Sequence, residues 1–130
     1  MNIGEAAKAT GVPAKMIRYY ESIGLLPQAE RTGGGYRAYD EKALHQLRFV
    51  RRARDFGFSM RQIKALLKLW SDHRRPSRRV KEIALGHVAE LNMKIEQLTQ
   101  LRDVLAELAA RCHGDSRPDC PILEDLERGY

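Results

Sequence analysis

The feature that most constrains this chain is the run from Arg79 to Ala110, which has no proline and a single glycine. Apolar side chains recur in it every three or four residues, the spacing of one face of an α-helix. A helix of this length spans about 45 Å and cannot bury such a face alone. The recurring residues are Val80, Ala84, Val88, Leu91, Ile95, Leu98, Leu101, Leu105 and Leu108.

The most economical partner for this apolar face is the same helix of a second copy. No other segment of the chain is long enough to cover it. We therefore expect a homodimer joined by a coiled coil. The spacing of the apolar residues does not distinguish a parallel arrangement from an antiparallel one.

Charge is unevenly distributed along the 130 residues. Residues 1–78 hold 16 basic and 7 acidic side chains, whereas residues 79–130 hold 7 basic and 10 acidic ones. A basic first half favours a polyanionic partner, and nucleic acid before membrane. No run approaches the roughly 20 apolar residues of a membrane span. We expect no signal peptide at the start of the chain. Two cysteines do not make a disulfide framework, so we expect a cytoplasmic location with reduced thiols.

The first part of the chain predicts a helix-turn-helix followed by a wing. Short helices are expected over residues 3–10 and 13–22, with Gly11 between them and Pro13 in the first turn of the second. Gly24 suits the position just after that second helix. Residues 31–37 contain three consecutive glycines and predict the tip of a hairpin, which is the wing.

Capping residues predict where the next helices begin. Asp40 precedes an expected helix over residues 41–56, and Ser59 with Gln62 forms a capping box for another that ends near Trp70. Near the end of the chain, Pro121 suits the first turn of a short helix. Asp119 is the residue that we expect to cap it.

These elements predict a mostly α-helical protein. Its expected parts are a winged helix-turn-helix domain over residues 1–70, a linker over 71–78, a dimerisation helix over 79–110, and a loop with a short helix over 111–130. The site expected to contact DNA combines the second helix, the wing and a basic third helix, since long donor side chains reach phosphates and base edges. Its candidate residues are Lys15, Arg18, Tyr19, Arg31, Tyr36, Arg37 and Arg54.

Several motifs in this order resemble the MerR family of bacterial transcription regulators, along the whole chain. They are Ile3-Gly4-Glu5-Ala6-Ala7, Ile17-Arg18-Tyr19-Tyr20-Glu21, Gly24-Leu25-Leu26, Gly35-Tyr36-Arg37 and Phe56-Gly57-Phe58-Ser59. The resemblance implies a winged-helix homodimer with an antiparallel coiled coil. It implies that Lys15, Arg18, Tyr19, Tyr36 and Arg37 contact promoter DNA. Metal binding would then distort the DNA so that RNA polymerase can engage.

The tail is similar to that of the copper-efflux members of the family. Cys112, seven intervening residues and Cys120-Pro121-Ile122 carry this similarity, which implies that both cysteines are metal ligands. Two thiolates are too few for a closed zinc site, which takes four ligands. They suit a soft monovalent ion, above all Cu(I), with Ag(I) and Au(I) as equivalents. The implied regulator activates metal-efflux or detoxification genes.

A monovalent ion with two thiolates carries a net negative charge that needs compensation. The amino end of the helix at Pro121 is one source, and Lys81 of the dimer is another, although a solvated lysine is an equally good reading. Divalent-ion sensors of the family carry a cysteine near Ser77, so the serine favours a monovalent ion. From its position alone, Ser77 is a linker or cap residue. His113 is a weaker ligand candidate than the cysteines.

Other functions stay open or are excluded. A thiol redox switch that uses Cys112 and Cys120, or a response to another metal ion, is the alternative. A sensor of organic cations needs a larger C-terminal domain than the residues after the coiled coil provide. No catalytic triad, phosphate loop or paired carboxylates in a plausible cleft is recognisable, so we expect no enzyme.

Overall fold

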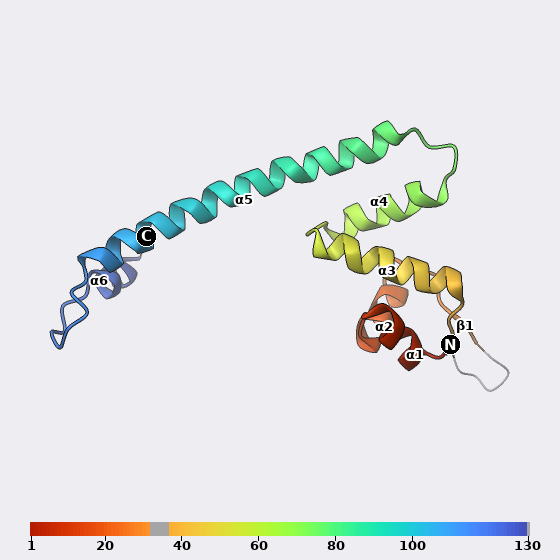
Figure 1. The fold of residues 1–130 in the computed structure, drawn as a ribbon, viewed down its shortest axis with the longest axis horizontal. Helices are drawn as coiled ribbons and strands as arrows, with labels where there is room; N and C mark the ends of the chain where they lie inside the picture. The colour runs from red at the N-terminus through yellow and green to blue at the C-terminus, as the bar shows by residue number, and fades with distance from the viewer. Residues whose placement is uncertain (32–36, 130) are drawn as a thin grey trace. The chain divides into compact units, whose positions relative to one another are not determined.

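The computed structural model describes residues 1–31 and 37–129. Its elements, in chain order, are α1 (Ile3–Thr10), α2 (Ala14–Ser22), β1 (Glu30–Arg31), β2 (Arg37–Ala38), α3 (Glu41–Asp55), α4 (Met60–Ser71), α5 (Ser77–Arg111) and α6 (Pro121–Arg128) (Figure 1). The chain divides into two compact units, Met1–Ile83 and Ala84–Tyr130. The expectation of a mostly α-helical chain is confirmed.

The first unit is built around one apolar core. Helix α1 packs on α2 and α3, and α3 packs on α4. The largest fully buried side chains are Ile17, Leu47, Val50 and Ile63, which come from α2, α3 and α4. The buried residues of α3 (Leu44, Leu47, Val50 and Ala53) recur every three residues, and those of α4 (Ile63 and Leu67) are four residues apart. The periodicity that predicts the helices therefore also selects the side chains of the core.

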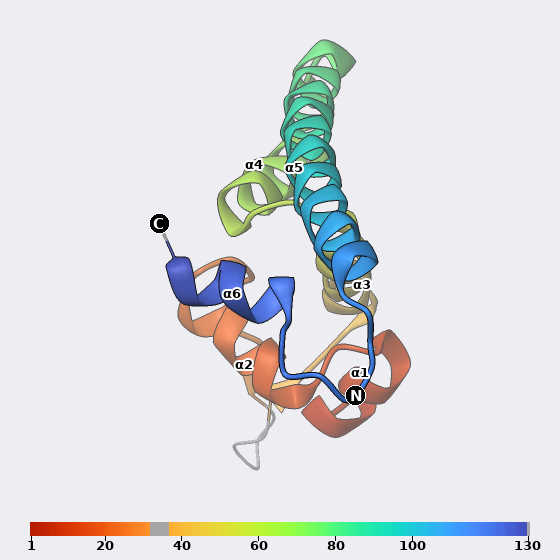
Figure 2. The same ribbon diagram turned by 90° about the vertical axis from the view of Figure 1, so that its left-hand side faces the viewer.

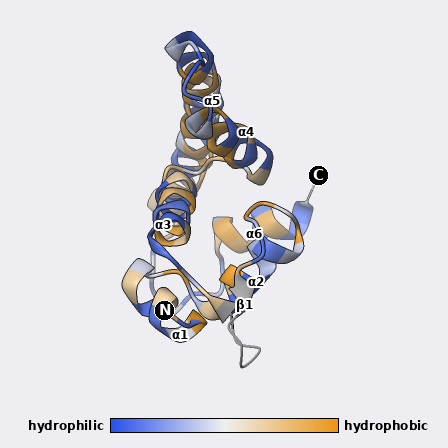
Figure 3. Ribbon diagram, turned by 90° about the vertical axis from the view of Figure 1, so that its right-hand side faces the viewer, coloured by the Kyte–Doolittle hydropathy of each residue, from blue (hydrophilic) through white to orange (hydrophobic). Residues whose placement is uncertain are grey.

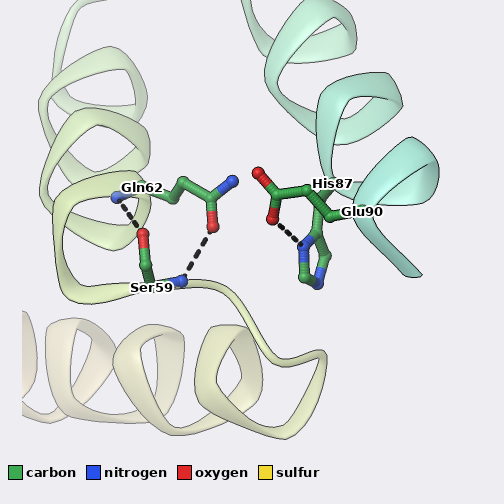
Figure 4. A network of polar contacts seen from close by, with 4 residues as sticks. All are labelled: Ser59, Gln62, His87 and Glu90. Carbon is green, nitrogen blue, oxygen red and sulfur yellow. Dashed lines mark hydrogen bonds and ion pairs between the residues drawn. The ribbon is translucent and has the colours of Figure 1, made fainter. Parts of the chain in front are cut away.

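Local capping interactions fix where the helices of this unit begin. The carboxylate of Asp40 accepts a hydrogen bond from the Ala43 N–H at 2.9 Å. Ser59 and Gln62 form the reciprocal pair of a capping box at 2.8 and 3.1 Å (Figure 4). Both predicted caps are therefore confirmed. Pro13 is the N-cap residue of α2 and lies outside its first turn, which corrects the predicted start by one residue.

The two strands form the base of the predicted hairpin. They pair antiparallel, with Glu30 opposite Ala38 and Arg31 opposite Arg37. Tyr36, predicted at the tip, lies outside the described residues. The strands hold two residues each, so the ladder contributes few hydrogen bonds of its own.

Helix α5 begins two residues before the predicted dimerisation helix and ends one residue after it. In the single chain, the apolar residues of α5 that belong to the second unit are exposed. Leu98 is 65% exposed, Ile95 60% and Leu101 58%. Apolar and polar segments alternate along the helix in Figure 3. These residues leave an extended apolar surface for a partner.

Helix α6 follows a loop that leaves the end of α5 (Figure 2). Its N-cap residue is Cys120, and Pro121 occupies the first turn. The predicted cap at Asp119 is therefore wrong. Cys120 itself has the extended backbone of an N-cap (φ −145°, ψ 110°), so Asp119 lies one residue too early.

None of the described helices is long and apolar enough to cross a membrane.

We expect Ile63→Ala to destabilise the first unit by about 2–5 kcal/mol, because Ile63 is fully buried and its truncation leaves a cavity. Chemical denaturation followed by circular dichroism measures this change. Ile23→Ala is the matched control, since Ile23 is 42% exposed and its truncation should cost much less. Equal losses of stability for the two variants would contradict the assigned core.

Candidate metal centre and DNA-facing residues

The fold brings the two cysteines of the tail together. The Cys112 thiol donates to the Cys120 sulfur, and the two Sγ atoms are 3.9 Å apart. Both residues are free thiols and half-buried. A disulfide needs a sulfur separation of about 2.05 Å, whereas two metal–thiolate bonds of about 2.3 Å span up to about 4.6 Å. The observed separation is therefore within reach of a single bridging ion.

The position of Cys120 at the start of α6 favours its thiolate form. A hydrogen bond from the backbone N–H of Leu123 lowers the pKa of the Cys120 thiol from its ordinary value. Hydrogen bonds from the Ile122 N–H and from the Cys112 thiol act in the same direction, and desolvation and the Glu124 carboxylate oppose them. The thiolate is the species that binds a soft metal ion.

The pair of sulfurs has no third protein ligand beside it in the described chain. Among the described residues, no group of three or more His, Cys, Asp or Glu side chains could hold a metal ion together. His113 is exposed and does not complete such a group with the cysteines. Asp115 is engaged within the loop, where its carboxylate accepts from the Arg117 N–H and side chain at 2.9 Å.

Ser77 and Lys81 lie at the opposite end of α5 from the cysteines. Ser77 is the first residue of this 35-residue helix, which is about 52 Å long, and Lys81 lies one turn later. Both residues are exposed. The two residues can therefore reach a metal at Cys112 only from a second chain.

Helix α2 separates a buried face from an exposed one. Ile17, Tyr20 and Glu21 are buried, whereas Lys15, Arg18 and Tyr19 are exposed. All three predicted contacts of the second helix thus lie on its accessible side. The basic groups and the phenol are free to approach phosphates and base edges.

The remaining predicted DNA contacts among the described residues lie on strands β1 and β2 and on α3. Arg31 and Arg37 are paired across the two strands by their backbones. Arg54 is exposed near the end of α3, and its guanidinium donates to the Tyr20 hydroxyl at 3.4 Å. This contact ties the basic helix to the buried side of α2.

Sequence reasoning missed the role of Glu21. It was noticed only as part of a motif, yet it is a buried carboxylate that accepts a hydrogen bond from the Tyr39 hydroxyl. The signal was available, because Glu21 follows Ile17 by four residues and therefore lies on the apolar side of its helix. The partner, 18 residues further along the chain, could not be read from that spacing.

Two family models together match residues 1–108 of the chain. The MerR HTH family regulatory protein model matches residues 1–70, and the model described as MerR, DNA binding matches residues 44–108. The chain belongs to the MerR family. It is a DNA-binding transcription regulator and not an enzyme, as the sequence predicts.

Curated members of the MerR family are similar along almost all of the chain. Heavy metal-dependent transcription regulator 2 of Rhizobium meliloti is 57% identical, over 99% of this chain and 88% of its own. The HTH-type transcriptional regulator CueR of Salmonella typhimurium is 43% identical, over 97% of this chain and 91% of its own. The chain is thus similar to CueR, although the heavy metal-dependent regulator is more similar.

A solved member of the MerR family confirms the fold. The transcription regulator PbrR691 from Ralstonia metallidurans, crystallised with lead(II), superposes with a TM-score of 0.81 at 33% identity. The match covers 97% of this chain and 98% of that one. The long helix after the helix-turn-helix fits a dimerisation helix, as in the regulators of this family, which function as dimers.

Proposed function

We propose that this MerR-family regulator senses a monovalent soft metal ion, Cu(I) in the first place and Ag(I) or Au(I) as equivalents, through Cys112 and Cys120. In this proposal, metal-bound dimers activate metal-efflux genes from promoter DNA in the cytoplasm. The observation that carries it is the pair of free thiols whose sulfurs lie 3.9 Å apart. Heavy metal-dependent regulators among the relatives support it.

The donor set favours a soft ion of low coordination number. Thiolates prefer soft ions, and the described residues offer two of them without a third His, Cys, Asp or Glu ligand. Zinc sites take four ligands, so the pair does not suit a closed zinc site. A monovalent ion that accepts two sulfurs is the best match to this donor set.

Compensation of the negative charge determines how tightly such a site holds a monovalent ion. Two thiolates around a single positive charge leave one net negative charge, and the amide groups that begin α6 point partial positive charge at Cys120. In an antiparallel dimer, the start of one α5 lies beside the end of the other. This arrangement would place the partner chain's Ser77 and Lys81 near the site, where the ammonium would neutralise the remaining charge.

Activation requires that the metal-bound dimer favour one DNA shape over another. Ordering of the Cys112–Cys120 loop would reposition α6, whose Leu123 and Leu126 are 64% and 67% exposed in the single chain. Bending or untwisting a promoter costs on the order of several kcal/mol. The differential binding energy of the two dimer states must supply that amount, and RNA polymerase would then engage the distorted promoter.

Two other readings have observations in their favour. A divalent heavy metal is one, because the similar regulator PbrR691 was crystallised with lead(II). A thiol redox switch is the other, because a sulfur separation of 3.9 Å needs only a modest movement to form a disulfide. Metal selectivity separates the first of these from the proposal, and activity under strictly reducing conditions separates the second.

We expect competition titrations under reducing conditions to show that the wild-type protein binds Cu(I) and Ag(I) tightly. The wild type should bind Pb(II) and Hg(II) at least about 100-fold more weakly than Ser77→Cys binds them. The introduced cysteine would supply a third thiolate in the dimer and raise the affinity for the divalent ions. Ser22→Cys, which places an exposed thiol at the end of α2, controls for an added sulfur. Equal divalent affinity in the wild type and Ser77→Cys would exclude the proposed role of Ser77.

A further inference from the structure

Tyr39 is the point where three distant segments of the first unit meet. Its hydroxyl donates to the Glu21 carboxylate at 2.5 Å, and both side chains are buried at 5% exposure. Its backbone N–H donates to the Met1 carbonyl at 2.7 Å, and the Met1 amino group donates back to the Tyr39 carbonyl at 3.1 Å. The start of the chain, helix α2 and the end of strand β2 are therefore joined at one residue.

The strand pair β1–β2 needs such an anchor because its ladder is short. Strands β1 and β2 pair over two residues each, and an isolated two-stranded hairpin is marginally stable at best. Tyr39 directly follows β2, and Asp40 directly after it caps α3. Of these contacts, the hydroxyl–carboxylate hydrogen bond is the one that reaches α2.

Glu21 lies on the same helix as residues that are proposed to contact DNA. It occupies the buried side of α2, whereas Arg18 and Tyr19 occupy the exposed side of the same helix. A rigid link from Glu21 to Tyr39 therefore connects the exposed face of α2 with the strand that carries Arg37. Buried hydrogen bonds are costly to break, because the polar groups left behind have no water to pair with.

We infer that Glu21 and Tyr39 are positioning residues for DNA binding, which hold strand β2 at a fixed place relative to helix α2. The two elements then meet DNA as one preorganised surface, and less entropy is lost on binding. This inference rests on the proposed contact of Arg37 with DNA. It assigns to the Glu21–Tyr39 pair a function that neither residue could perform by touching DNA, because both are buried.

The test is a double-mutant cycle on the dimeric full-length protein. The probe is a labelled DNA duplex that the wild-type protein selects from a randomised pool, and affinity is measured by fluorescence anisotropy. We expect Tyr39→Phe, which removes only the hydroxyl, to weaken binding about tenfold. Because the hydroxyl acts through the strand that carries Arg37, Tyr39→Phe should reduce DNA affinity much less in an Arg37→Ala background than in the wild type.

A second readout distinguishes positioning from stability. Loss of wing contacts should reduce the salt dependence of binding by roughly one phosphate contact, which simple destabilisation would not change. Thr10→Val is the matched control, since it removes another buried hydroxyl. That hydroxyl donates to the Ala6 carbonyl at 2.8 Å, within helix α1. Thr10→Val should lower the melting temperature without changing the salt dependence. Glu21→Gln, which keeps an oxygen acceptor, should retain more affinity for DNA than Glu21→Leu.

The outcomes separate this inference from the function on which it rests. If Arg37→Ala alone leaves affinity unchanged, the wing does not contact DNA and the proposed contact itself fails. If Arg37→Ala weakens binding but Tyr39→Phe does not, the wing contact stands and the anchoring role is overturned. Additive losses for Tyr39→Phe and Arg37→Ala would likewise overturn it, because independent effects do not pass through a common element.

Discussion

Cys112→Ser is expected to lower the affinity for Cu(I) by far more than 100-fold, and Cys120→Ser to do the same. Each change removes one of two ligands, and even the loss of a group that merely supports a ligand costs about 10–100-fold. A serine hydroxyl is a hard donor and does not replace a thiolate for a soft ion. Titration of the dimer against a colorimetric Cu(I) chelator, under reducing conditions, measures this loss.

His113→Ala is the matched control for the cysteine variants. His113 is adjacent to Cys112, but it is exposed and forms no three-ligand group with the two thiols. We expect its replacement to leave Cu(I) affinity within about threefold of the wild type, the usual size of a surface change. Tight Cu(I) binding that survives in both serine variants would place the metal elsewhere in the protein.

Placing glutamate at both Leu98 and Leu101 is expected to convert the dimer to monomers. Both side chains are exposed in the single chain, at 65% and 58%, and lie one turn apart on α5. Burial of a leucine contributes about 1.5–3 kcal/mol, and each dimer would lose four of them and gain four charges in its seam. The dissociation constant should therefore rise at least about a thousandfold, as analytical ultracentrifugation would show.

Gln100→Glu adds a negative charge to the same stretch of α5, off the apolar face. This variant should remain dimeric and keep its affinity for DNA. The Leu98 and Leu101 variant should lose most of its DNA affinity, since the two helix-turn-helix domains of the dimer would no longer be joined. A dimer that persists with both glutamates in place of the leucines would show that this face is not the interface.

Local chemistry explains why so much of the secondary structure could be predicted. Asp40 and the Ser59–Gln62 pair act on backbone groups three residues away, so a helix start is readable from a short window of sequence. The apolar spacing of α5 is equally local. The wrong N-cap at Asp119 arose because Asp119 and Cys120 are both close enough to Pro121 to begin the helix. The structure makes Cys120 the N-cap residue, one position later than predicted.

The sequence by itself determined the family, the helices and the candidate residues, because motifs, caps and periodicity are all properties of neighbouring positions. Only the tertiary structure decided that the sulfurs of Cys112 and Cys120 approach to 3.9 Å, and that the Glu21 carboxylate meets the Tyr39 hydroxyl. Both pairings depend on how a loop or a core closes in three dimensions. The energy of such long-range contacts comes from packing and desolvation of the whole unit, which no short window of sequence contains.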